Sequence, residues 1–187
     1  MNLFLNAVSS HGIILLFDEN RNIISKQAIN VAWNESEKLI PILDNFLKDN
    51  NIKYSDLQNL VVVAWPWSFT WIRTITLMIN TINFVIKGNI TALNYFDLFD
   101  NFPVIKSSSK RDSFFKKNQS SQIEIMQNEE ILKYLQENNI TELYWENKNI
   151  ENIKIFENID YSAIIKNIDF QQNKKINPIY LKRPSIS

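Results

Sequence analysis

Short apolar runs separated by polar turns occupy the first thirty residues. Residues 2–8, 13–17 and 23–31 have the length and apolar content of strands, and Ser-, Gly-, Asp- and Asn-rich turns separate them. The pattern predicts three consecutive strands that form an antiparallel meander.

Helical spacing of apolar residues begins after this meander. It predicts a helix over 35–48 with Asn34 as its N-cap. The β-branched run 60–64 is typical of a strand buried on both faces, and a long apolar helix is predicted over 69–86, with Gly88 as its stop. A short strand at 89–92 and a helix at 93–99 follow, so the order is β-β-β-α-β-α.

Beyond residue 101 the strands become shorter and more polar. The predicted elements are strands at 103–107, 112–116, 122–126, 141–145 and 154–156, helices at 128–137 and 161–168, and an extended tail at 178–183. Asn128 is expected to cap the helix at 128–137. We predict an N-terminal lobe at 1–99 and a shorter α/β lobe at 100–187.

Composition narrows the classes of site. The 187 residues include 20 basic and 20 acidic side chains, one His and no Cys. These counts exclude a disulfide scaffold, Cys-ligated zinc and any site that needs two histidines, so we expect no bound metal and a turn role for His11. Balanced charge, no secretory signal and no apolar run near 18 residues predict a cytoplasmic protein without membrane contact.

The segment 63–73 joins the buried strand to the long helix and reads V-A-W-P-W-S-F-T-W-I-R. Strand-to-helix junctions of α/β proteins bind anions and usually need glycine. Its signature loop consists of Trp65, Pro66, Trp67, Ser68, Phe69, Thr70 and Trp71. With Gly in place of Trp, the segment closely resembles the G-P-G-S-F-T-G-L-R signature of the TsaB (YeaZ) family. That family is the non-catalytic partner subunit in bacterial tRNA threonylcarbamoyladenosine biosynthesis.

Other segments resemble the family in the right order. They are 34–41, 55–57, 110–115 and 178–183. Two features depart from the family: residues 5–10 lack the Asp of its phosphate-loop remnant, and the second lobe is shorter. Both departures argue against independent nucleotide chemistry.

The resemblance implies an actin/Hsp70-like (ASKHA, ribonuclease-H-like) two-lobe fold with mixed sheets. It implies a scaffold that binds and activates TsaD, which transfers the threonylcarbamoyl group to N6 of adenosine 37 in tRNA. A TsaE ATPase completes the complex, so ATP and metal are expected on partner subunits, tRNA contact through the complex, and self-association when the partner is absent. The family's interface helices correspond to 35–48 and 68–86 here. The predicted interface residues are Leu39, Leu43, Ser68, Phe69, Thr70, Arg73 and Leu77.

The chain has two glycines and five tryptophans, and its tryptophans stand where the family or a turn calls for glycine. They are Trp33, Trp65, Trp67, Trp71 and Trp145. Some bacterial lineages read the UGA codon as glycine, whereas a common alternative code reads it as tryptophan. We hypothesise that these residues are glycines translated with the wrong code; UGG codons in the coding DNA would refute this. The alternative is an exposed aromatic patch for a sugar or a partner.

Two further function classes stay open. A small phosphotransferase or carbamoyltransferase of the same superfamily needs a phosphate-loop Asp, and an aromatic ligand-binding module needs genuine tryptophans.

A basic cluster either contacts tRNA phosphates or is a solvated loop. It comprises Lys106, Lys110, Arg111, Lys116 and Lys117. Arg73 pairs with a carboxylate of a partner or with Glu37 or Asp44 of its own chain.

Overall fold

The computed structural model describes residues 1–9, 12–29, 36–145, 153–155 and 159–180. The chain divides into two compact units: unit 1 consists of Met1–Tyr95 and the residues from Tyr161 onward, and unit 2 is Phe96–Asp160. The prediction that the second lobe spans 100–187 is therefore wrong, because the residues from Tyr161 onward belong to unit 1. The chain returns to unit 1 because aromatic rings pack there: Tyr161 lies edge-on to Phe4, with ring centroids 5.5 Å apart.

Unit 1 is built on a five-stranded mixed sheet with the order β3-β2-β1-β4-β5. Its strands are β1 (Asn2–Asn6), β2 (Gly12–Phe17), β3 (Ile23–Ile29), β4 (Asn59–Trp65) and β5 (Asn89–Asn94). The first three are antiparallel, as the meander predicted, while β4 and β5 run parallel to β1. This is the ribonuclease-H-like arrangement that the resemblance implied.

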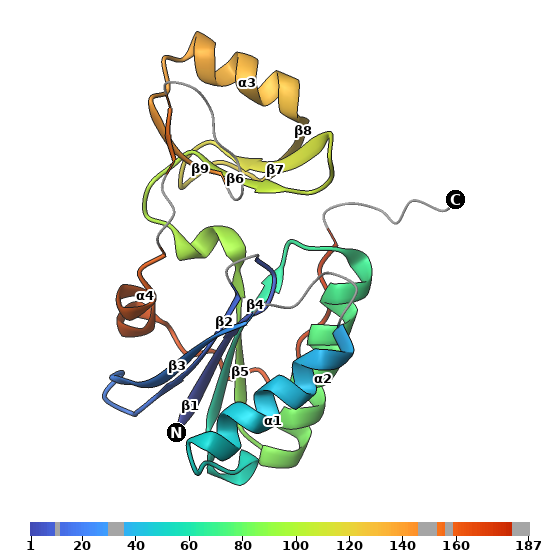
Figure 1. The fold of residues 1–187 in the computed structure, drawn as a ribbon, viewed down its shortest axis with the longest axis vertical. Helices are drawn as coiled ribbons and strands as arrows, with labels where there is room; N and C mark the ends of the chain where they lie inside the picture. The colour runs from blue at the N-terminus through green and yellow to red at the C-terminus, as the bar shows by residue number, and fades with distance from the viewer. Residues whose placement is uncertain (10–11, 30–35, 146–152, 156–158, 181–187) are drawn as a thin grey trace. The chain divides into compact units, whose positions relative to one another are not determined.

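Three helices flank this sheet. Helices α1 (Leu39–Asp49) and α2 (Phe69–Ile86) lie on one side, and α4 (Tyr161–Asn167) lies on the other (Figure 1). The predicted cap Asn34 lies outside the described residues; a 3-10 turn at Ser36–Lys38 leads into α1. Pro41 therefore stands in the first turn of α1, where its missing N–H leaves no intrahelical bond unmade. Residues 93–99 do not form an α-helix, because β5 continues to Asn94 and a 3-10 turn (Tyr95–Leu98) follows.

A row of asparagine side chains marks the amino ends of the parallel strands. Asn2, Asn59 and Asn89 stand opposite one another in the sheet. The Asn59 amide donates to Asn2 Oδ1 at 2.8 Å, and the Asn89 amide donates to Asn59 Oδ1 at 3.4 Å. A one-residue slip would separate these amides and leave buried polar atoms unpaired, so the row helps to fix the register.

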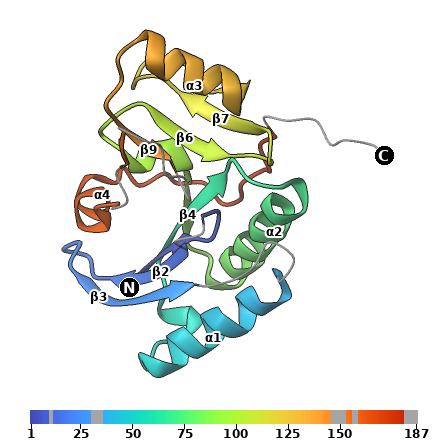
Figure 2. The same ribbon diagram turned by 45° about the horizontal axis from the view of Figure 1, so that its top comes forward.

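Unit 2 repeats the scheme of unit 1 on a smaller scale (Figure 2). Its elements are β6 (Val104–Ser107), β7 (Asp112–Lys116), β8 (Glu124–Gln127), α3 (Asn128–Glu137), β9 (Glu142–Trp145) and β10 (Lys154–Ile155). The order β10-β9-β6-β7-β8 again places an antiparallel meander beside two parallel strands. The chain thus has an α/β, actin/Hsp70-like fold with two mixed sheets; α1, α2 and α4 pack on the first, and α3 packs on the second.

The core of unit 2 lies between its sheet and α3. It is formed by Ile105, Phe115, Ile131, Leu135, Leu143 and Trp145. The predicted N-cap of α3 is shifted by one residue: Gln127 is the N-cap, and its backbone N–H donates to Glu130 Oε2 at 3.2 Å. Asn128 instead accepts a hydrogen bond from the Ser113 hydroxyl and donates to the Lys110 carbonyl.

Candidate functional site

The signature loop lies between the central strand β4 and the N-terminus of α2. The run from Leu60 to Ala64 in β4 is buried because parallel neighbours pair with both of its edges and apolar layers cover both faces. Ser68 is the N-cap of α2, and its hydroxyl oxygen accepts a hydrogen bond from the Trp71 backbone N–H at 3.4 Å. The loop therefore ends in a side-chain cap that fixes where α2 begins.

Trp71 connects the first turn of α2 to the end of β1. Its side chain is buried, and its indole N–H donates a hydrogen bond to the Ala7 carbonyl. A buried Trp needs such a partner for its only polar atom. The indole consequently fills the space above the carboxyl end of the first strand.

Asn6 lies at that carboxyl end, where the family has an aspartate-containing loop. It is fully buried, and its amide donates to the Tyr161 hydroxyl at 3.0 Å and to Ser9 Oγ at 3.3 Å. Its Oδ1 accepts the Val8 N–H at 3.2 Å. A neutral side chain engaged by its own chain therefore occupies this position. Among the described residues, no three His, Cys, Asp or Glu side chains come together as metal ligands.

The tryptophan positions can be compared with what glycine would provide. The described residues with left-handed φ are Arg21, Asn51, Lys87 and Asn139, so none of the four described tryptophans requires glycine for its φ. Trp33 lies outside the described residues. The backbone φ angles therefore do not support the hypothesis that these tryptophans are mistranslated glycines. It stays a prediction that the codons in the coding DNA test.

The same four tryptophans do not form the exposed aromatic patch that was the alternative. Trp71 and Trp145 are buried, and Trp65 and Trp67 are half-buried. An aromatic surface made of these indoles is therefore wrong, because packing takes up much of their area.

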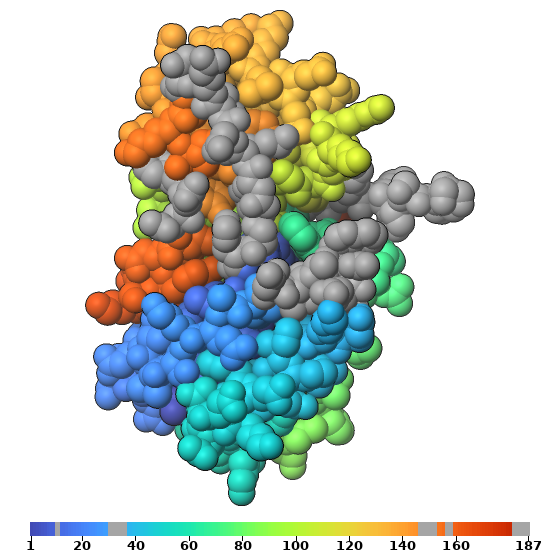
Figure 3. Space-filling view, in the orientation of Figure 1, coloured from blue at the N-terminus to red at the C-terminus, as the bar shows by residue number. Residues whose placement is uncertain are grey.

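Two of the predicted interface residues are wrong. Leu39 and Leu43 are fully buried, since the periodic apolar positions of α1 are the side that faces the core. Helix α1 reaches the surface in Figure 3 (blue to cyan). Its exposed apolar side chain is instead that of Ile40, at 52%.

The remaining predicted residues, Ser68, Phe69, Thr70, Arg73 and Leu77, are all exposed around the beginning and middle of α2. Sequence reasoning missed two further exposed apolar side chains toward the end of the helix. Phe84 is 84% exposed and Val85 is 67% exposed. The available signal was that this 18-residue helix contains one charged residue, too few to cover a solvated face.

Arg73 is that charged residue. Its guanidinium carbon lies 5.4 Å from the centroid of the Phe69 ring, a cation–π distance. Within the described part of the chain, neither Glu37 nor Asp44 forms an ion pair with it. The predicted ion pair of Arg73 with Glu37 or Asp44 of its own chain is thus not formed.

Helix α2 is also long and apolar enough to cross a membrane by length and composition. It contributes Trp71, Ile72, Ile75, Met78 and Ile79 to the core of unit 1. A helix with one buried face passes the same test.

A second polar feature lies where α1 ends. The end of α1 and the turn after it line an open groove, in which the Tyr54 hydroxyl donates a 2.5 Å hydrogen bond to Asp44 Oδ1. Burial, and then this bond to the carboxylate, raise the pKa of Tyr54 above its usual value. The Tyr54 hydroxyl is thus a proton donor to the Asp44 carboxylate.

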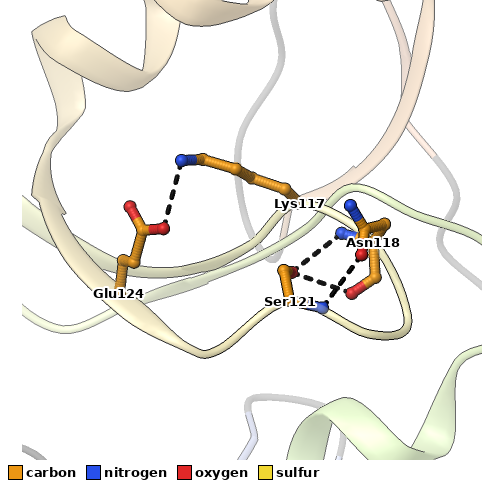
Figure 4. A network of polar contacts seen from close by, with 4 residues as sticks. All are labelled: Lys117, Asn118, Ser121 and Glu124. Atoms are coloured by element: carbon orange, nitrogen blue, oxygen red, sulfur yellow. Dashed lines mark hydrogen bonds and ion pairs between the residues drawn. The ribbon is translucent and has the colours of Figure 1, made fainter.

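The basic cluster of unit 2 does not act as one surface. Lys106 is fully buried, whereas Lys110 and Arg111 are exposed. Lys117 forms a 3.1 Å ion pair with Glu124, beside a turn closed by Asn118 and Ser121 (Figure 4). The predicted contact with tRNA phosphates is therefore wrong for Lys106, whose side chain is buried. It stays a prediction for the exposed Lys110 and Arg111.

Comparisons with known proteins bear on the fold of the chain. No protein-family model matches the sequence. The chain is 25% identical to the uncharacterized protein MG208 of Mycoplasma genitalium over 189 residues, which is 97% of this chain and 95% of that protein.

Two solved structures are similar in fold. One is a crystal structure of an uncharacterized protein with similarity to peptidase YEAZ from Pseudomonas aeruginosa, with a TM-score of 0.68, 8% identity, and coverage of 97% of this chain and 100% of that one. The other is YeaZ from Pseudomonas aeruginosa, with a TM-score of 0.53 and 11% identity over 67% of this chain and 64% of that one. The chain therefore has the fold of YeaZ-like proteins.

Proposed function

We propose that this chain is a TsaB (YeaZ) family member and the non-catalytic scaffold subunit of a tRNA threonylcarbamoyladenosine complex. Its role is to bind and activate a TsaD-like transferase, while a TsaE-like ATPase and the tRNA join through the complex. The observation that supports this most is the position of the signature residues. Pro66, Ser68, Phe69, Thr70 and Arg73 stand at the start of α2, in a chain with the YeaZ-like fold.

The surface of α2 supports a partner-binding role. An exposed apolar face with a single cation is unfavourable in water and is typical of a surface that another protein covers. Removing such side chains from water contributes about 25 cal/mol per Å² of apolar area before the costs of association.

The carboxyl end of β1 supports a non-catalytic role. Phosphoryl transfer in this superfamily needs a carboxylate there to hold the metal that neutralises phosphate charge. This chain has the neutral Asn6, which Tyr161, Ser9 and Val8 engage.

The decisive experiment is co-expression of the full chain with the TsaD-like subunit of the same genome. We expect a stable complex and loss of threonylcarbamoyladenosine from tRNA when this chain is withheld. No complex together with unchanged modification would refute the scaffold role. Turnover of ATP by the isolated chain would favour the enzyme alternative instead.

A further inference from the structure

The segment after α4 forms a strap along unit 1, defined here as residues 171–180. It first covers the free edge of β5: the Ile90 N–H donates to the Asn173 carbonyl at 2.8 Å, in an antiparallel bridge. The Gln171 N–H donates to the Thr91 hydroxyl oxygen at 2.9 Å. The Lys174 ammonium donates to the Gly88 carbonyl and to Asn89 Oδ1, both at 2.9 Å.

The strap then crosses onto α2 (Figure 1, in red). The Asn80 side chain donates to the Ile176 carbonyl and accepts the Ile176 N–H, both at 2.9 Å, as a neighbouring strand would. The Asn83 amide donates to the Lys174 carbonyl at 2.9 Å. Two helix side chains thus fix the path of backbone that has no regular secondary structure.

The strap reaches the first turn of α2 with an aromatic contact. The Tyr180 ring stacks on the Phe69 ring, with centroids 4.6 Å apart and planes 27° apart. Both rings remain more than a third exposed, and Ile179 beside them is 45% exposed. The contact therefore adds apolar area to the surface of α2 without closing it.

Helical geometry places this contact at the border of the exposed face of α2. At about 100° per residue, Phe69, Arg73, Leu77 and Phe84 fall within about 80° of one another. Asn80 falls about 20° from Phe69, and Asn83 lies on the buried side. The strap consequently runs along one edge of the exposed face, and Tyr180 widens that face.

We propose that the strap forms one wall of the partner-binding surface, which takes an apolar helix of the partner that carries a carboxylate opposite Arg73. This inference rests on the proposed function, in which that partner is the TsaD-like subunit. The carboxylate follows from charge complementarity, since Arg73 has only the Phe69 ring beside it among the described residues. A standard interface buries about 800 Å² on each partner. The exposed side chains of Phe69, Leu77 and Phe84, with Tyr180 at their border, offer an apolar helix a surface that the strap bounds on one side.

The test places a photo-cross-linking amino acid, benzoylphenylalanine, at single positions of the full chain and irradiates it with the TsaD-like subunit. Adducts are expected from positions 77 and 180, and none from position 24 on β3, the exposed control. An adduct from 77 without one from 180 would overturn the wall and leave the proposed function standing. Adducts from neither position would overturn both.

Affinity gives a second measurement. Tyr180→Ala should weaken binding of the TsaD-like subunit about 5–10-fold, because a partly exposed ring at the border contributes less than a central hot spot. Tyr180→Phe keeps the ring and should bind within twofold of the original chain. Asn80→Leu, which removes both bonds to Ile176, should match Tyr180→Ala. Unchanged affinity in both Tyr180→Ala and Asn80→Leu would contradict the inference.

Discussion

Helices α2 and α3 each precede a parallel strand of their own sheet, β5 in unit 1 and β9 in unit 2, yet their outer faces differ. The outer face of α3 is charged, with Glu129, Glu130, Lys133 and Glu137 in contact with water and a Lys133–Glu137 pair at 3.7 Å. The outer face of α2 carries Leu77, Phe84 and Val85. Since both helices already pack on their own sheets, the apolar face of α2 is not required by the fold. The difference supports the proposal that α2 binds a partner.

The two helices also reach the next strand differently. Both are followed by a residue in the left-handed region, Lys87 after α2 and Asn139 after α3. The next residue is Gly88 in unit 1 and Ile140 in unit 2. A Cβ on Gly88 would lie 2.3 Å from the Gln58 carbonyl oxygen, so the predicted helix stop needs glycine for close approach rather than for its φ.

The largest effect is expected at this junction. Gly88→Ala should lower the free energy of unfolding by about 2–3 kcal/mol, because the clash is with backbone that cannot rotate away. Urea unfolding measures this. Gly12→Ala serves as the control: its Cβ would lie 3.1 Å from the Asn6 carbonyl oxygen, and it should cost less. Equal losses from the two substitutions would contradict the close-approach argument.

The next effect tests the outer faces directly. Leu77→Asp should weaken binding of the TsaD-like subunit about 30-fold, which corresponds to about 2 kcal/mol, because it places a carboxylate in the middle of the apolar face. Leu132→Asp makes the same change on the outer side of α3 and should leave affinity within twofold. Isothermal titration calorimetry measures both, with circular dichroism to verify folding. Comparable losses from the two variants would remove the distinction between the helices.

Much of this fold follows from local sequence patterns. The limits of α2, α3 and β7 agree with the predicted ranges, because the spacing of apolar residues in each segment has the period of its element. The strap could not be predicted in this way. Asn80 and Ile176 are 96 positions apart, and a hydrogen bond between them leaves no periodic trace.

The candidate site was predicted only in part, for a physical reason. Leu39 and Leu43 were predicted from the resemblance, which indicates the interface helix but not which of its sides faces outward. Their apolar periodicity places them on the buried side of this amphipathic helix. Phe84 and Val85 stand out only once the buried side of α2 is known. Likewise, the role of Asn6 depends on Tyr161, which is distant in sequence.

A smaller effect concerns the left-handed residues after the two helices. A side chain in this region costs about 1–2 kcal/mol, although asparagine tolerates it better than lysine does. Lys87→Gly should therefore raise the free energy of unfolding by about 0.5–1 kcal/mol, after the added entropy of the unfolded chain. Asn139→Gly should change it by less than about 0.5 kcal/mol. Equivalent gains in thermal unfolding would show that residue type does not matter here.

The smallest effect separates the turns that join the second strand to the third in each unit, β2 to β3 in unit 1 and β7 to β8 in unit 2. In unit 1, the Asp18 carboxylate accepts the Asn22 backbone N–H at 2.8 Å and its side-chain amide at 2.9 Å. In unit 2, the neutral Asn118 Oδ1 accepts the backbone N–H groups of Ser120 and Ser121 at 3.1 and 2.9 Å. Of these two turns, only the one in unit 1 therefore has a titratable hydrogen-bond acceptor.

These bonds from Asn22 lower the pKa of Asp18 below its ordinary value of 3.8. A lowered pKa in the folded state means that the stabilisation is present above pH 3.8 and is lost as the pH falls through the folded value. In an NMR titration, the Asn22 amide shift should follow Asp18 below pH 3.8, and Asp18→Asn should abolish that dependence. The amide shifts of Ser120 and Ser121 should not show this step. An Asn22 shift that is independent of pH in the original chain would mean that the carboxylate does not close the turn.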